Sequence, residues 1–151
     1  MQAEVSTIHE VIPAMALFDR YLIVKKSKLP KAGNGLFTTV NIPKGNRITE
    51  YKGRLQRWSA VKDQDGFNGY LLRVHRSWAI NALKTLQTFG RYANDAKGIS
   101  KNKFIRNNAE YVSDGLRCYL ESIREIKKGE EILAAYGSDY WKLIRKIKRQ
   151  R

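Results

Sequence analysis

The sequence predicts a single, mostly β domain with short helices, and three observations lead to this prediction. Short runs of apolar or alternating residues recur along most of the chain, as they do in β-strands. Glycine-containing turns separate these runs, and helical periodicity is confined to a few short segments. The length of 151 residues suits one domain, and the 42% apolar and 28% charged residues have a globular balance.

From Tyr21 onward, the predicted strands follow one another through turns. In order, the sequence indicates a strand in YLIVKKS (21–27), a glycine turn and strand in KAGNGLFTT (31–39), a Pro-Gly turn and strand in IPKGNRITEYKG (42–53), and a hairpin around HRS in residues 69–83. A lysine-rich loop and a strand are expected in residues 97–112. Residues 115–137 then contain a strand, the turn KKGE and a final apolar segment.

Helical structure is expected at three places. Residues 54–66 suit a helical turn and a loop, and residues 84–95 begin helix-like and stop at or near Gly90. Residues 138–151, SDYWKLIRKIKRQR, form a basic amphipathic pattern with Trp141, Ile144 and Ile147 on one face. We therefore divide the chain into an N-terminal extension (1–20), partly helical at most, a domain (21–137) and a basic C-terminal helix or tail (138–151).

The charge of the chain is strongly basic, with 29 Lys and Arg against 14 Asp and Glu and a net charge of +15. Such a surface attracts polyanions such as nucleic acid, although a basic protein without a specific partner has the same composition. The single cysteine, Cys118, excludes a disulfide within the chain and a thiolate zinc cluster. Its strand-like neighbours, LRCYLESI, favour core packing over reactivity.

The cellular setting is predicted from what the sequence lacks. The lack of disulfides is typical of a reducing, intracellular setting, either nuclear or prokaryotic cytoplasmic. No apolar run approaches the ~20 residues that span a bilayer, and we identify no signal peptide. No membrane association and no metal site are therefore expected.

Four short motifs contain the candidate functional residues, and each also has a purely structural interpretation. GNG (33–35) fits a ligand-contacting turn or a plain hairpin turn, and EYKG (50–53) fits a pocket wall or a strand-end aromatic. RYANDA (91–96) with NNAEY (107–111) fits a polar site or a solvated loop. KKGEEILAAYGSDYW (127–141) fits a site-forming segment or a core strand.

The order and spacing of these motifs resembles the SET-domain protein lysine methyltransferases. That family has, in order, a GxG turn, a YxG strand end, an RFxNHS-like loop followed by a proline-Asn or an Asn pair, and a final E-E-L-x-x-x-Y. The similarity runs from about Tyr21 to Trp141. It implies small curved β-sheets around a pseudoknot, in which the C-terminal segment passes beneath the RYANDA loop. S-adenosylmethionine would enter one face and the target lysine a narrow channel from the other.

The resemblance also implies roles for individual residues. Tyr136 matches the family tyrosine beside the transferring methyl group and is the expected catalytic residue. The expected cofactor contacts are Gly33, Asn34, Gly35, Arg91, Tyr92, Asn94, Asp95 and Trp141, with Tyr140 as an alternative to Trp141 for stacking on the adenine. The expected lysine channel consists of Tyr51, Tyr70, Tyr111 and Tyr136.

Two departures from the family pattern leave alternatives open. The family His and Ser or Cys after Asn94 are replaced by Asp95 and Ala96, and the three-cysteine zinc segment that many members have is absent. The leading hypothesis is methylation of a lysine in a histone, a chromatin-associated protein or a ribosomal protein, with possible nucleic-acid contact and a homodimer. The alternatives are a catalytically impaired SET-like scaffold on nucleic acid or chromatin, and an unrelated basic β-protein that binds nucleic acid.

Overall fold

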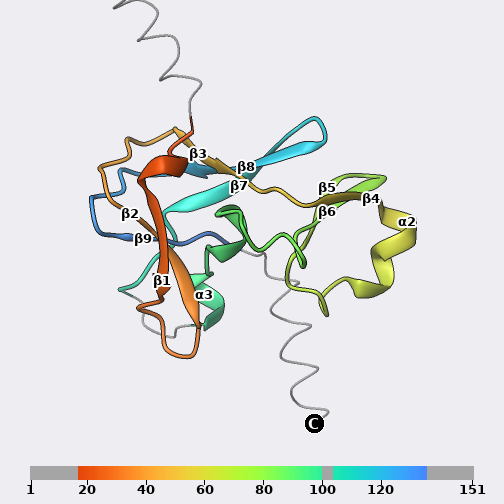
Figure 1. Ribbon diagram of the computed structural model, residues 1–151, viewed down its shortest axis with the longest axis horizontal. Coiled ribbons are helices and arrows are strands. Elements are labelled where there is room, and N and C mark those ends of the chain that lie inside the picture. The colour runs from red at the N-terminus through yellow and green to blue at the C-terminus, as the bar shows by residue number, and fades with distance from the viewer. Residues whose placement is uncertain (1–16, 100–103, 136–151) are drawn as a thin grey trace, which may run out of the picture.

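The computed structural model describes residues 17–99 and 104–135, which form three small antiparallel sheets (Figure 1). Each sheet has three strands, in the orders β1-β2-β9, β3-β8-β7 and β4-β6-β5. The helices of this part of the chain are short: η1 (Asp19–Tyr21), α2 (Trp58–Val61), η2 (Lys62–Gln64), η3 (Gly90–Tyr92) and α3 (Ala96–Ile99). The predicted mostly β fold with short helices is thus confirmed.

The first sheet is built on a hairpin near the N-terminal end of the described chain. β1 (Leu22–Lys26) pairs with β2 (Asn34–Thr38), and the short β9 (Glu131–Ile132) pairs with the other edge of β2. The hairpin turn contains two positive φ angles, 60° at Lys31 and 67° at Gly33. Glycine adopts such an angle without steric cost, so Gly33 suits the point at which the connection of residues 27–33 enters β2.

The second sheet packs with the first to form the main core. It consists of β3 (Arg47–Glu50), β8 (Arg117–Ser122) and β7 (Ala109–Asp114), with β8 in the middle. The core cluster contains ten buried residues: Leu22, Leu36, Ile42, Ile48, Ala93, Ala109, Leu120, Ile126, Ile132 and Ala134. Burial of this apolar surface is the main favourable contribution to folding, at about 25 cal/mol per Å².

The third sheet contains the hairpin that the sequence predicted around HRS. β5 (Leu71–His75) pairs with β6 (Trp78–Asn81), and β4 (Arg54–Arg57) pairs with the other edge of β6. The expectation of a helical turn over residues 54–66 is therefore wrong at its start, because residues 54–57 are a strand and the helix begins at Trp58. Pairing with β6 supplies the ladder hydrogen bonds that a local pattern cannot indicate.

The helix-like start predicted for residues 84–95 is also absent. Residues 84–89 form turns, and the 3-10 helix η3 begins at Gly90 instead of ending there. A Cβ added to Gly90 would lie 2.9 Å from both the carbonyl oxygen of Glu50 and the Cα of Tyr51. The glycine is therefore explained by close packing of two backbone segments, not by a helix end.

The segment after β9 passes between two loops that are distant in sequence. Leu133 forms a parallel bridge with Asn94, and Ala134 forms one with Ala109. The N–H of Ala134 donates to the carbonyl of Asn94 at 2.9 Å, and the N–H groups of Asn108 and Ala109 donate to the carbonyl of Leu133 at 2.9 and 3.0 Å. This arrangement agrees with the expected passage of the C-terminal segment against the RYANDA loop.

Several predicted features lie outside the described residues. These are most of the N-terminal extension (1–16), Tyr136, Tyr140, Trp141 and the basic C-terminal helix (138–151). Within 17–99 and 104–135, no helix has the length and apolar character needed to cross a membrane. The same ranges contain no group of three or more His, Cys, Asp or Glu that could hold a metal ion.

Candidate functional site

An open cavity lies where the β1–β2 turn, the segment before β5 and the loop around η3 meet. Its volume is about 460 Å³. It is lined by Ala32, Gly33, Asn34, Gly69, Tyr70, Arg91, Tyr92 and Asn94. The structure therefore brings five of the eight predicted cofactor residues to one cavity, together with Tyr70 of the predicted lysine channel.

The two glycines of GNG are needed for different structural reasons. At Gly33 the φ angle is 67°, and an added Cβ would meet no atom within 4 Å, so the backbone borders open space on the cavity side of the turn. At Gly35 an added Cβ would lie 2.1 Å from Oε1 of Glu131. Gly35 is thus required by a buried carboxylate behind the strand, and it does not line the cavity.

The Glu131 carboxylate connects the hairpin to the RYANDA loop. Glu131 is only 6% exposed. Its oxygens accept hydrogen bonds from Oγ of Ser27 at 2.5 Å, the N–H of Lys28 at 3.1 Å and Nδ2 of Asn94 at 3.4 Å. Nδ2 of Asn94 also donates to the carbonyl of Asn34 at 3.0 Å. Because a buried charge needs such donors, the network holds Asn94 and the hairpin in one arrangement.

Arg91 forms part of the wall between the cavity and the third sheet. Its Nη1 donates to the carbonyls of Ala82 and Leu83, each at 3.0 Å. Its guanidinium lies 3.9 Å from the ring centroid of Tyr70 and 5.4 Å from that of Tyr92. Since Arg91 is 9% exposed, these contacts fix it as a buried cation beside two aromatic rings.

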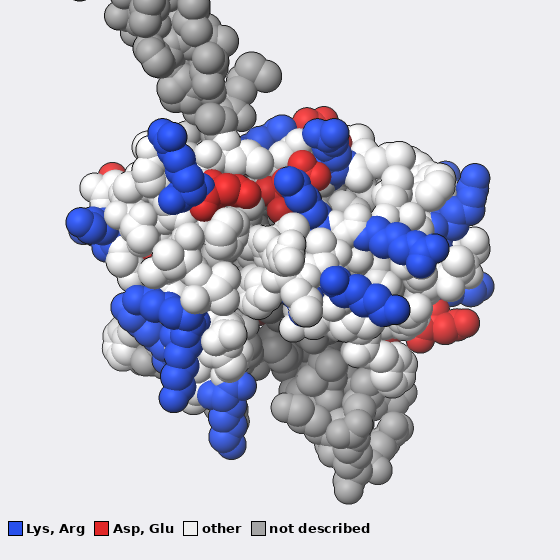
Figure 2. All heavy atoms as spheres, in the orientation of Figure 1, with Lys and Arg blue, Asp and Glu red and all other residues white. Residues whose placement is uncertain are grey.

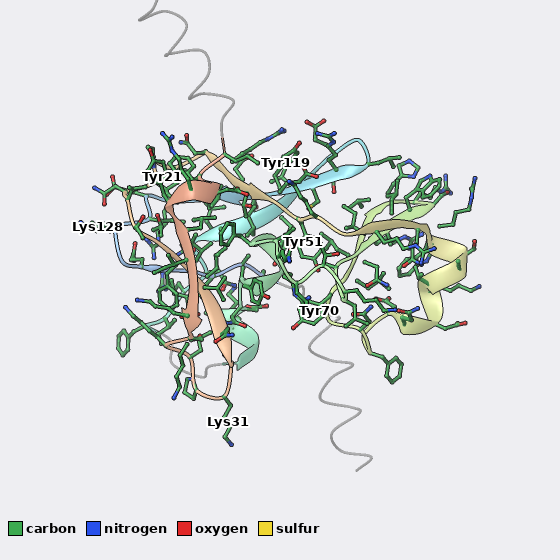
Figure 3. The ribbon with its side chains drawn as sticks, viewed as in Figure 1. Tyr21, Lys31, Tyr51, Tyr70, Tyr119 and Lys128 are labelled. Carbon is green, nitrogen blue, oxygen red and sulfur yellow. The ribbon has the colours of Figure 1, made fainter. Side chains whose placement is uncertain are left out.

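The predicted channel tyrosines of the described chain lie in a contact series. The Tyr51 hydroxyl donates to the carbonyl of Tyr70 at 2.7 Å, and the Tyr51 ring meets Tyr111 edge-on with centroids 5.6 Å apart. Figure 3 shows Tyr51 and Tyr70 near the middle of the molecule, between the second and third sheets. Of the three, only Tyr70 lines the cavity, and it is joined to Tyr51 by the hydrogen bond just described.

Asp95, the residue that departs from the family pattern, points away from the cavity. It is 2% exposed, and its Oδ1 accepts from the N–H of Lys97 and from Nδ2 of Asn107, each at 3.0 Å. Oδ1 of Asn107 accepts from the N–H of Ala96 at 2.9 Å. The carboxylate therefore supports the start of α3 and joins the RYANDA loop to the NNAEY segment, so a cofactor contact from Asp95 would come from its backbone.

Sequence reasoning missed several residues of the site. Glu131 and Asn107 carry the hydrogen bonds under the loop, and Ala32 and Gly69 complete the cavity lining. For Glu131 a signal was present, because a charged residue at the start of an apolar strand segment is costly to bury without a partner. Tyr136 and Trp141, the predicted catalytic and adenine-contacting residues, lie outside the described residues.

Comparison with known proteins gives one family and two curated relatives. The family described as SET domain matches residues 33–137. The histone-lysine N-methyltransferase EZH2 of Chaetomium thermophilum is 28% identical over 139 residues, which cover 83% of this chain and 9% of that protein. The N-lysine methyltransferase KMT5A-A of Danio rerio is 28% identical over 115 residues, covering 70% of this chain and 32% of that protein. The chain thus spans less than a third of the length of either relative.

Solved structures show the same fold. A structure described as ctPRC2 in an autoinhibited conformation bound to S-adenosylmethionine aligns with a TM-score of 0.63 and 22% identity, covering 89% of this chain and 17% of that one. A humanized mutant of the Chaetomium thermophilum Polycomb Repressive Complex 2, bound to the inhibitor GSK126, aligns with a TM-score of 0.60 and 24% identity. It covers 82% of this chain and 16% of the other.

Proposed function

The chain belongs to the SET-domain family, and from this premise we propose that it is a protein-lysine N-methyltransferase. In this proposal, a methyl group passes from S-adenosylmethionine to the side-chain amine of a lysine in another protein. The observation that carries the proposal is the cavity, which gathers Gly33, Asn34, Arg91, Tyr92 and Asn94 from two distant segments.

The residues around the cavity fit the proposed cofactor. A volume of about 460 Å³ lies within the range of roughly 300–1,000 Å³ that is usual for small-molecule sites. The backbone at Gly33 borders open space, and the Asn34 and Asn94 side chains offer both donors and acceptors. S-adenosylmethionine supplies the activated methyl group on its sulfonium, and the protein supplies orientation.

The tyrosines at and near the cavity suit the target lysine. A lysine amine has a pKa of about 10.4 in water, and only its neutral form can attack a methyl group. Enclosure by Tyr51, Tyr70 and Tyr111 would disfavour the ammonium form by desolvation, and the neighbouring Arg91 guanidinium would disfavour it further. A tyrosine hydroxyl or a backbone carbonyl would then orient the nitrogen lone pair. Tyr136 is proposed for this role by its match to the family tyrosine.

The proposed substrate is a lysine-bearing protein associated with nucleic acid, such as a histone, another chromatin protein or a ribosomal protein. The net charge of +15 supports it, because a basic enzyme is attracted to complexes that contain polyanions. One of the relatives is a histone-lysine N-methyltransferase, which supports a histone in particular. A homodimer that completes the substrate surface belongs to the same proposal.

Calorimetric titration with S-adenosylmethionine tests the cofactor site. We expect binding by the unaltered protein and about 10- to 100-fold weaker binding by Asn94→Ala, because the loss leaves the Glu131 carboxylate and the Asn34 carbonyl without this donor. Asn46→Ala is the matched control, since its amide bonds to the carbonyls of Pro43 and Lys44, away from the cavity lining. Equal affinities for the two variants would contradict the assigned site.

Methyl transfer is tested separately with Tyr136→Phe. We expect this variant to bind S-adenosylmethionine as the unaltered protein does and to lose transfer to a histone or ribosomal-protein mixture, as followed with a radiolabelled methyl group. Failure of the unaltered protein to bind the cofactor would contradict the enzyme proposal and favour the scaffold hypothesis.

A further inference from the structure

We propose that the outer end of the third sheet is a nucleic-acid-binding surface, distinct from the cavity. We name this surface the basic tip, and it consists of Arg57, Trp58, Arg73, His75, Arg76 and Trp78. Figure 2 shows Lys and Arg side chains spread over the right-hand lobe, where Figure 1 places β4, β5, β6 and α2.

Two arginine–tryptophan stacks form the basic tip. Arg57 and Trp78 are cross-strand partners of β4 and β6, and the guanidinium of Arg57 lies 4.8 Å from the indole centroid. Arg73 of β5 lies 4.4 Å from the ring of Trp58, the first residue of α2. The N–H of Trp58 donates to the carbonyl of Ser77 at 2.8 Å, which holds the start of α2 against the β5–β6 turn. Both stacks are therefore at the same end of one sheet.

The charge of this end is not neutralised by nearby carboxylates. Residues 51–81 contain six Lys or Arg but only two Asp and no Glu. The ion pairs found between described residues join Arg47 to Asp114, Arg117 to Glu50 and Arg124 to Glu130, so none of them uses an arginine of the basic tip. The three arginines of the tip are exposed, and stacking on an indole leaves the guanidinium edge able to donate to an anion.

The combination of exposed arginines with tryptophans favours nucleic acid over an acidic protein surface. Phosphate groups accept the paired donors of a guanidinium, and arginine is the usual residue for this contact. Trp58 and Trp78 are only half-buried, so their rings have surface left for stacking on a base or sugar. A carboxylate-rich protein surface would pair with the arginines, but its Asp and Glu side chains have no ring that stacks on the two indoles.

The position of the basic tip relative to the cavity would allow bound nucleic acid to bring a substrate protein close to the cavity. Tyr70 borders the cavity and immediately precedes β5, whose last residue is His75 in the tip. At about 3.3 Å per residue, the strand separates the two by roughly 16 Å. Nucleic acid on the tip would thus leave the cavity open and could hold an associated lysine-bearing protein beside it. This use rests on the proposed function, whereas the binding itself does not.

The test compares two double variants with the same net charge. Binding of a short labelled DNA duplex and of an RNA hairpin is measured by fluorescence anisotropy over a range of salt concentrations, without any cofactor. Arg57→Gln/Arg73→Gln removes both stacked cations of the tip. Lys31→Gln/Lys128→Gln is the control, because these lysines lie on the β1–β2 turn and before β9, far from the third sheet (Figure 3).

We expect the tip variant to bind about tenfold or more weakly at low salt, with a salt slope shallower by about 1–2 for duplex DNA. The control should lose much less. Preference for the duplex or for the RNA then identifies the kind of nucleic acid. Equal losses in the two double variants would overturn the proposal, as would failure of the unaltered chain to bind either probe.

Two further measurements separate loss of binding from loss of folding, and nucleic acid from an acidic protein. If circular dichroism shows that the tip variant is unfolded, Arg76→Gln replaces it and Lys31→Gln becomes the matched control, because no arginine–tryptophan stack of the described residues involves Arg76. We then expect Arg76→Gln to lose more affinity than Lys31→Gln. Polyglutamate serves as the acidic protein probe, and a tip variant that loses affinity for polyglutamate but keeps its affinity for both nucleic acids would overturn the assigned partner.

Discussion

At Gly35, a buried carboxylate fills the space that a Cβ would need. An alanine Cβ there would lie 2.1 Å from Oε1 and 2.9 Å from Cδ of Glu131. The carboxylate cannot simply rotate away, because it accepts hydrogen bonds from Ser27, Lys28 and Asn94. The second glycine of GNG is therefore linked to the cavity residue Asn94 through Glu131, and not through a ligand.

We expect Gly35→Ala to lower the free energy of unfolding by about 2–4 kcal/mol, because it displaces a hydrogen-bonded buried charge. Urea denaturation measures the effect. The control is the same substitution in a Glu131→Ala background, where the clash is gone and the cost should be smaller by at least about 1 kcal/mol. The same cost in both backgrounds would show that Glu131 is not the cause.

Asp95 shows what could and could not be predicted for a single residue. The position of the loop followed from its resemblance to a known motif, and the structure does place Asn94 beside Gly33 and Arg91. The use of the carboxylate did not follow, because its partners Asn107 and the Lys97 N–H come together only when two segments fold against each other. Long-range partners of this kind leave no local periodicity in a sequence.

Among the elements, the strands with alternating or apolar patterns were predicted well, including the hairpin of β5 and β6 and the glycine turn before β2. Their apolar residues reach the core, since β2 is buried from Gly35 to Thr38 and β6 is buried at Ala79 and Ile80. The errors fall on Arg54–Arg57, which is a strand, and on residues 84–89, which form turns. In both places the backbone follows contacts with other segments, which outweigh weak local preferences.

The turn between β8 and β9 is held by a glutamate. Oε2 of Glu130 accepts from the N–H of Lys127, and both carboxylate oxygens meet Arg124 at 3.3 Å. Partial burial alone would raise the pKa of Glu130, but the Arg124 and Lys127 hydrogen bonds outweigh it and hold the pKa below its ordinary value. Because the folded-state pKa is depressed, the carboxylate stabilises the fold above its unfolded pKa, and this contribution is lost as pH falls through the folded-state pKa.

We therefore expect Glu130→Gln to be less stable than the unaltered protein at pH 7 and to approach it at pH values below about 4. Urea denaturation at a series of pH values measures the difference. Arg124→Gln is the partner control, since removal of one cause of the pKa shift should reduce the difference made by Glu130→Gln. A difference that is constant with pH would mean that the glutamate acts through packing alone.

At the scale of the whole molecule, Cys118 marks the contact between two sheets. It lies on β8 of the second sheet and is 1% exposed. Its cluster also contains Tyr51 and, from the third sheet, Val74 and Ile80. Burial raises the pKa of the Cys118 thiol to about 12. Since the folded-state value is raised, the contribution of the neutral thiol is present below its unfolded pKa and is lost as pH rises toward the folded value.

The only thiol of the chain should therefore report the separation of these sheets. At pH 8 we expect a thiol reagent to modify Cys118 in the folded protein at least about a hundredfold more slowly than in strong denaturant, because the side chain is 1% exposed and its raised pKa suppresses the thiolate, so that reaction requires the cluster to open. The rate of modification should increase with urea with the same dependence as global unfolding, since the Cys118 cluster includes residues of both sheets. The fully denatured chain provides the reference rate. A rate that is independent of urea would mean that the third sheet opens from the second without global unfolding, and the cavity wall at Tyr70 would then open with it.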